Sequence, residues 1–173
     1  MLQSDVLLLL LRETSVTEET SPRFAVGTFD TWPQVREALR DGGLRGIVLD
    51  SLNCLALERI FAGKHILAPD GKRVAIQLLP FPGNVESIAC TSGVLADRLV
   101  QRLRAGARSL GDALGHWLIP RHAAGFEFEV RAGKILFWMQ IANSDGERRA
   151  YQCLLTHSSG SVGVHDLFAP GDG

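Results

Sequence analysis

The stretch of residues 115–141 constrains the fold more than any other part of this chain. Pro120 ends the apolar segment before it, because proline disfavours helical backbone for the preceding residue. Pro120 can also open a new helix, since its missing N–H costs nothing in the first turn. Farther on, residues 135–141 are rich in β-branched and aromatic side chains and lie between Gly133 and a polar segment at 143–146. This run predicts a central strand that is covered on both faces.

Residues 121–131, between these two features, fit two different patterns. Ala123, Phe126 and Val130 recur at the spacing of one helix face, whereas residues 126–130 alternate with the period of a strand. We favour the helix, because Gly133 offers a C-terminal stop. The strand is left open as the alternative.

The first third of the chain has the pattern of strand, helix and strand. Residues 24–29 predict a strand, and Thr31 with Gln34 predicts a capping box at the start of a helix that ends near residues 42–43. Residues 46–50 predict the second strand. The three elements together form a compact β-α-β unit.

The C-terminal third repeats that order. The strand at residues 135–141 is followed by a helix that Asn143 or Ser144 caps, and residues 161–167 predict a closing strand with alternating exposure. Two β-α-β halves predict an α+β fold, a ferredoxin-like sandwich with one antiparallel sheet and its helices on one face.

The middle of the chain predicts an insertion between the two halves. Pro69, Asp70 and Gly71 lie between two apolar runs, so a hairpin is expected there, and residues 84–118 have a helical pattern. The expected organisation is an apolar arm and linker at residues 1–23, a single domain at 24–168 and a frayed tail at 169–173.

Composition excludes several classes of protein. The chain has 173 residues, of which 46% are hydrophobic and 21% charged, so global disorder is excluded. Its formal net charge of -1 provides no field that would attract nucleic acid or anionic lipid. The apolar run at residues 6–11 is far shorter than the roughly 20 residues of a membrane-spanning helix. Three widely spaced cysteines indicate reduced thiols and a cytoplasmic protein.

The order of elements resembles a bacterial family of general-stress and heat-induced stress proteins, many of them domains of unknown function. Val26, Phe29 and Asp30 match the opening strand of that family. The later motif is matched by Gly111, Leu114, Ile119, Pro120, Ala124, Phe128, Glu129, Gly133, Ile135 and Leu136, and the closing strand by His165 and Asp166. The resemblance implies a ferredoxin-like core, a helix at residues 121–131 and a stress-linked role, with no catalytic residues to transfer. Charged residues between 97 and 108 interrupt the glycine zipper of the family, which argues against membrane insertion.

Five residues are candidates for a ligand site: Cys54, His65, His116, Trp117 and Trp138. A cysteine at a strand end can be a nucleophile if a histidine lies nearby, although a free cysteine is more often a small buried apolar residue. The tryptophans can line a pocket or simply fill the core. The histidines lack the spacing of metal ligands, so we expect no metal and no cofactor. Four arginines at 98–108 suggest a solvated helix face rather than a phosphate or nucleic-acid contact.

Two functional hypotheses follow. No catalytic motif is present, which favours a non-enzymatic binding or assembly module whose partner is a protein or a small molecule. The alternative is a small ligand-binding domain or enzyme with a pocket between the sheet and the inserted helices. We also expect a homodimer, in which the apolar arm before Arg12 pairs with or covers the sheet of a second copy.

Overall fold

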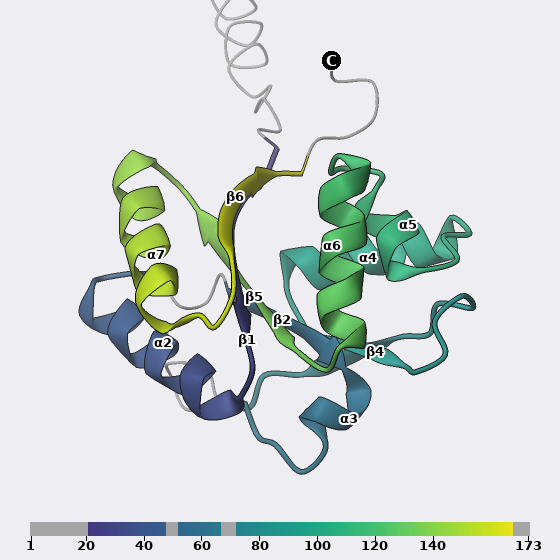
Figure 1. Ribbon diagram of the computed structural model, residues 1–173, viewed down its shortest axis with the longest axis horizontal. Coiled ribbons are helices and arrows are strands. Elements are labelled where there is room, and N and C mark those ends of the chain that lie inside the picture. The colour runs from purple at the N-terminus through teal and green to yellow at the C-terminus, as the bar shows by residue number, and fades with distance from the viewer. Residues whose placement is uncertain (1–20, 48–51, 67–71, 168–173) are drawn as a thin grey trace, which may run out of the picture.

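The computed structural model describes residues 21–47, 52–66 and 72–167 (Figure 1). Within them the chain is an α+β structure with an open antiparallel sheet of six strands, in the order β3-β4-β2-β5-β1-β6, and six helices. In chain order the elements are β1 (Arg23–Phe29), α2 (Trp32–Leu44), β2 (Leu52–Leu57), α3 (Glu58–Phe61), β3 (Ile76–Leu79), β4 (Ile88–Thr91), α4 (Val94–Arg104), α5 (Leu110–Leu114), α6 (Pro120–Arg131), β5 (Ile135–Ile141), α7 (Ser144–His157) and β6 (Val162–Asp166).

The apolar strand β5 lies in the middle of the sheet and divides the core into two layers. Trp138 of β5 faces a cluster that includes side chains of α4, α5 and α6, whereas its neighbour Phe137 faces a cluster with α2 and α7. The two groups of helices lie on opposite faces of the sheet (Figure 1). The expectation of helices on one face alone is therefore wrong, because the middle of the chain supplies helices with buried apolar sides that cover the second face.

Most local predictions agree with the structure. The capping box of α2 is formed, with the amide of Thr31 donating to Gln34 Oε1 at 3.1 Å. Asn143 caps α7 by accepting from the amide of Gly146 at 2.8 Å. The helical interpretation of residues 121–131 is confirmed, and Pro120 occupies the first turn of α6.

One predicted strand needs correction, and three other predicted segments lie wholly outside the described residues. The second strand spans Leu52–Leu57 rather than 46–50, since Gly46 and Ile47 lie in the turn that ends α2, and residues 48–50 are outside the described part. The predicted hairpin turn at 69–71 is also outside it, although the amide of Val74 donates to the carbonyl of Ile66 at 2.9 Å. The arm before residue 21 and the tail after residue 167 are not described either.

The helical expectation for residues 84–118 is wrong at Ile88–Thr91, which form the buried strand β4. This short apolar run has no periodicity that separates a buried strand from a helix. Pairing with β2 and β3 therefore decides its conformation. β3 is the preceding element, whereas β2 is separated from β4 by α3 and β3 along the chain.

A buried polar joint connects β2, β4 and α4. The side chain of Asn53 donates to the carbonyl of Thr91 at 2.9 Å and accepts from the amide of Leu95 at 3.4 Å. The hydroxyl of Thr91 accepts from the amide of Cys54 at 2.8 Å. A Cβ at position 93 would lie 2.5 Å from Asn53 Nδ2, so only glycine permits this approach. The joint therefore fixes where α4 begins.

Helix α6 covers the end of the sheet formed by β1 and β6 less closely than it covers β2 and β5. It packs against α5 and, in the sheet, mainly against β2 and β5, whereas β1 and the edge strand β6 come after β5 in the strand order. None of the helices in the described ranges is long and apolar enough to cross a membrane.

Candidate functional site

A cleft of about 410 Å³ lies between α6 and the end of the sheet formed by β1 and β6, and we call it the β6–α6 cleft. Its floor comes from β1 and β6 and one wall from α6. The residues that line it are Val26, Thr28, Arg121, His122, Gly125, Phe126, Glu129, Ser161, Val162, Gly163, Val164 and His165. Its volume is in the range of small-molecule sites in proteins, roughly 300–1,000 Å³.

The lining residues of α6 lie on one face of the helix because of their separation in the sequence. His122, Phe126 and Glu129 are four and three residues apart, and side chains at these separations lie above one another on a helix. Gly125 is on the same wall and has no side chain. A Cβ placed there would meet no atom within 4 Å, so the cleft is open at this point.

Strand β6 contributes His165, and Gly163 of the same strand leaves space for its imidazole ring. A Cβ at Gly163 would lie 2.9 Å from His165 Nε2, which shows that the imidazole folds back over this glycine. Side chains two residues apart on a strand share a face, so Gly163 and His165 both belong to the cleft side of β6.

Aromatic rings connect the cleft to the core. The ring of His165 lies 4.9 Å from that of His122 and 5.2 Å from that of Phe126, in both cases nearly perpendicular. Phe126 also contacts the buried ring of Trp138 at 5.2 Å. The two edge-to-face contacts of His165 and the tilted contact of Phe126 with Trp138 hold the wall and the floor of the cleft in a fixed relation.

Burial lowers the pKa of His165, and the positive charge of a protonated His122 lowers it further, while the carboxylate of Asp166 acts in the opposite direction. A histidine with a lowered pKa is predominantly neutral at pH 7. Near neutral pH the His165 imidazole therefore offers the cleft an uncharged ring that can donate or accept one hydrogen bond.

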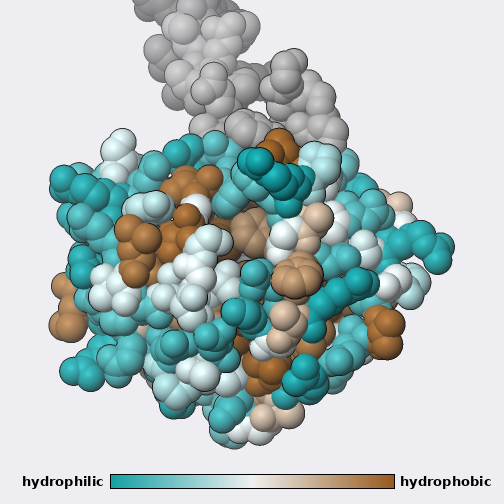
Figure 2. Space-filling model, in the orientation of Figure 1, coloured by the Kyte–Doolittle hydropathy of each residue, from teal (hydrophilic) through white to brown (hydrophobic). Residues whose placement is uncertain are grey.

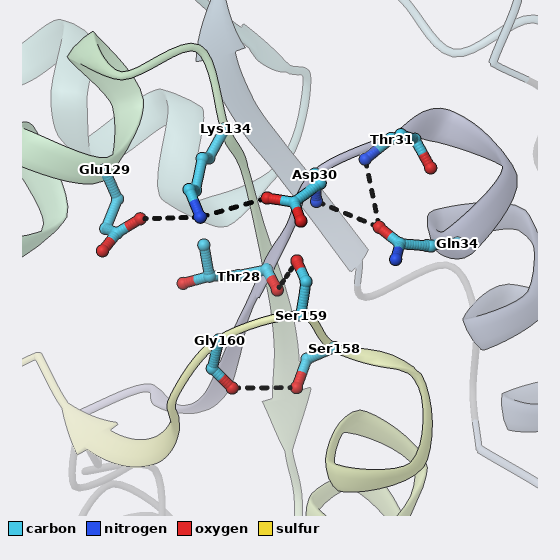
Figure 3. Close-up of polar contacts among 9 residues, drawn as sticks. All are labelled: Thr28, Asp30, Thr31, Gln34, Glu129, Lys134, Ser158, Ser159 and Gly160. Atoms are coloured by element: carbon cyan, nitrogen blue, oxygen red, sulfur yellow. Dashed lines mark hydrogen bonds and ion pairs between the residues drawn. The ribbon is translucent and has the colours of Figure 1, made fainter.

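Charged groups occupy the other end of the cleft. Lys134 Nζ lies 3.0 Å from Asp30 Oδ1 and 3.9 Å from Glu129 Oε2. Figure 3 shows the ammonium between the two carboxylates. The hydrogen bond that Lys134 donates to the carboxylate of Asp30 raises the pKa of Lys134, with a smaller contribution from the charge of Glu129. The carboxylate of Glu129 accepts no hydrogen bond from the described residues, and its Oε2 is buried.

The turn before β6 is tied to the floor of the cleft. The backbone carbonyl of Thr28 accepts from the amide of Ser159 at 2.9 Å and from its hydroxyl at 3.2 Å (Figure 3). A Cβ at Gly160 would lie 3.1 Å from the Cβ of Thr28, so the turn approaches β1 closely. These contacts position the start of β6 beside Glu129.

The five candidates from the sequence are spread over separate parts of the structure. Cys54 is buried on the α2–α7 side of the sheet, and Trp138 is fully buried on the other side with its indole N–H unpaired. His65 lines a second cleft of about 460 Å³ beside α2. His116 and Trp117 are in contact with each other between α5 and α6, and the guanidinium of Arg98 lies over Trp117.

The thiol of Cys54 is unsuited to act as a nucleophile. Burial raises its pKa to about 12, and burial also raises the pKa of Cys153 to about 11 and that of Cys90 well above its usual value. A nucleophilic cysteine needs a lowered pKa or an adjacent base. All three thiols therefore behave as small apolar groups in the core.

The cleft beside α2 is less fully described than the β6–α6 cleft. Its lining ends at Ile66, immediately before residues 67–71, which the structure does not describe. In the described ranges no group of three or more histidine, cysteine, aspartate or glutamate side chains could hold a metal ion. The β6–α6 cleft is therefore the better-defined candidate site.

The sequence interpretation did not select His122, Phe126, Glu129 or His165 as a group. The helix spacing of the first three was a usable signal, and so was the alternation that places Gly163 and His165 on one face of a strand. The meeting of α6 with β6 depends on the strand order of the sheet, which no local pattern shows.

Comparisons with protein-family models, with curated proteins and with solved structures find no match to this chain.

Proposed function

We propose that this chain is a non-enzymatic ligand-binding domain and that its ligand lies in the β6–α6 cleft. The observation that carries the proposal is the construction of the cleft. Gly125 leaves open space in the wall, Gly163 leaves room for the imidazole of His165, and three rings hold the surrounding walls in place. The apolar groups on the face shown in Figure 2 form separate patches among hydrophilic ones, which suits a small ligand better than a broad protein interface.

The polar contacts support binding rather than catalysis. Nucleophilic catalysis needs a base within hydrogen-bond reach of a hydroxyl or thiol. In the part of the chain that the structure describes, no cysteine, serine or threonine donates a hydrogen bond to a histidine. The alternative, an enzyme using the same cleft, would need a bound substrate or water to complete such a pair.

We also propose a ferredoxin-like core within the larger sheet. Four neighbouring strands have the order β6-β1-β5-β2, and the pairs β1–β2 and β5–β6 are each connected through a helix of the α2–α7 layer. Strands β3 and β4 then extend the sheet beyond β2. The link to bacterial stress proteins rests on the family resemblance and remains a prediction.

The proposed function can be tested without knowledge of the ligand. Native mass spectrometry of the purified chain would reveal co-purified small molecules, and a fragment library can be screened by the imidazole proton signals of its five histidines. Substitutions His122→Asn and His165→Asn assign the two signals of the cleft. Binding in the cleft predicts fragments that shift these two signals, and fragments that shift other histidines alone would contradict the proposal.

A homodimer is a separate proposal. The outer edges of β3 and β6 pair with no other described strand, and an exposed edge can accept a strand from a second copy. The apolar arm before Arg12 is the segment we expect to contribute. Light scattering should give twice the chain mass for the full-length protein and a lower mass after deletion of residues 1–12. A full-length monomer contradicts the dimer, and an unchanged dimer after the deletion excludes the arm.

A further inference from the structure

We infer that the ligand of the β6–α6 cleft is a flat ring that bears an amino group and is joined to an anionic group, as in a nucleoside monophosphate. This inference rests on the proposed function. Its basis is the separation of opposite charges along α6, with an aromatic wall between them.

The anionic group is expected at the start of α6. Arg121 lines the cleft there and forms no ion pair with the described residues, and His122 and His165 are its neighbours on the cleft wall. The N-terminal end of this 12-residue helix adds a partial positive charge. A guanidinium beside two imidazoles is complementary to a phosphate or a carboxylate.

The amino group is expected at Glu129. Asp30 is the closer partner of Lys134, and the buried Oε2 of Glu129 faces Lys134 at 3.9 Å. The other oxygen, Oε1, retains acceptor capacity that the described residues do not use. An N–H donor from a ligand would satisfy it. A ring carbonyl at the same position would be repelled by the carboxylate.

The wall between these ends suits a planar ring. Phe126 and His165 are the aromatic side chains there, and bases stack on such rings in many nucleotide sites. Arg121 and Glu129 are eight residues apart, which corresponds to about 12 Å along a helix. This length is close to that of an extended nucleoside monophosphate. The formal net charge of -1 favours a mononucleotide over a nucleic-acid strand.

Calorimetric titration of the full-length chain with four probes tests the ligand class. Adenosine 5′-monophosphate has both groups, adenosine lacks the anion, inosine 5′-monophosphate has a carbonyl in place of the amino group, and inorganic phosphate lacks the ring. We expect adenosine 5′-monophosphate to bind at least about tenfold more tightly than each of the others, since each good charge-assisted contact is worth about 1.4 kcal/mol or more.

Two variants assign the contacts to residues. Arg121→Ala should weaken adenosine 5′-monophosphate about tenfold and leave adenosine unchanged, whereas Arg104→Ala, an exposed arginine on α4, should change neither. Glu129→Gln should reduce the preference over inosine 5′-monophosphate to less than about threefold, because the amide can also donate to a carbonyl.

The outcomes separate this inference from the proposed function. Equal affinities for adenosine 5′-monophosphate and phosphate, or an unchanged affinity in Arg121→Ala, would overturn the ligand class. If adenosine 5′-monophosphate fails to bind while fragments still shift the signals of His122 and His165, the ligand class is wrong and the proposed function stands. If neither binds in the cleft, both are wrong.

Discussion

Replacement of Asn53 by alanine should destabilise the chain more than any loss of a surface contact. The substitution removes the donor to the carbonyl of Thr91 and the acceptor for the amide of Leu95. Both backbone groups belong to buried residues, and a buried polar group that loses its partner costs about 1–3 kcal/mol. The bond to Leu95 is long at 3.4 Å, so most of the effect comes from Thr91, and we expect a total of about 2–3 kcal/mol.

Urea unfolding followed by circular dichroism measures this cost. The midpoint should fall while the slope with denaturant stays constant, because the surface exposed on unfolding hardly changes. Ser158→Ala is a matched control, since it removes an exposed hydrogen bond to Gly160 and should change the free energy of unfolding by less than about 0.5 kcal/mol. A loss below about 1 kcal/mol for Asn53→Ala would refute the assignment of this joint as the support of β2, β4 and α4.

Three further outcomes follow from the same structure. The free energy of unfolding should decrease as the pH falls below about 6.5, because the pKa of His165 is lower in the folded chain and its imidazole is therefore protonated first in the unfolded chain. His165→Asn should flatten the pH profile of the urea midpoint in that range. Gly93→Ala should destabilise by an amount similar to Asn53→Ala, and the double variant should cost less than the sum, which a double-mutant cycle measures. An aromatic disulfide reagent should label no thiol in the native protein, because Cys54, Cys90 and Cys153 are all buried, and should label all three in urea. Rapid labelling of the native chain would contradict their burial.

Local signals in the sequence were sufficient for several elements. Thr31 and Gln34 marked the start of α2, Pro120 marked the start of α6, and the apolar run of β5 was identified with its bounds. Each of these signals depends on residues within one turn or one strand. Short-range physics therefore decides the element without knowledge of the rest of the chain.

Non-local pairing explains the errors. The run Ile88–Thr91 becomes a strand because β2 and β3 supply hydrogen-bond partners on both sides. Cys54 was expected after a strand end, but it is inside β2, and its pairing with Phe137 of β5 buries the thiol. The cleft was missed for the same reason, since β6 reaches α6 only through its pairing with β1, which places His165 opposite Phe24.

Filling the β6–α6 cleft at Gly125 tests the central claim most directly. Gly125→Leu adds a side chain at a position with open space, and leucine favours the helix over glycine by up to about 1 kcal/mol, so the fold should be retained. Ala124→Leu is the matched control, because it enlarges the neighbouring exposed position outside the cleft. Fragments that shift the imidazole signals of His122 and His165 in the unmodified chain should lose binding in Gly125→Leu and retain it in Ala124→Leu. Equal binding to both variants would contradict a ligand site in this cleft.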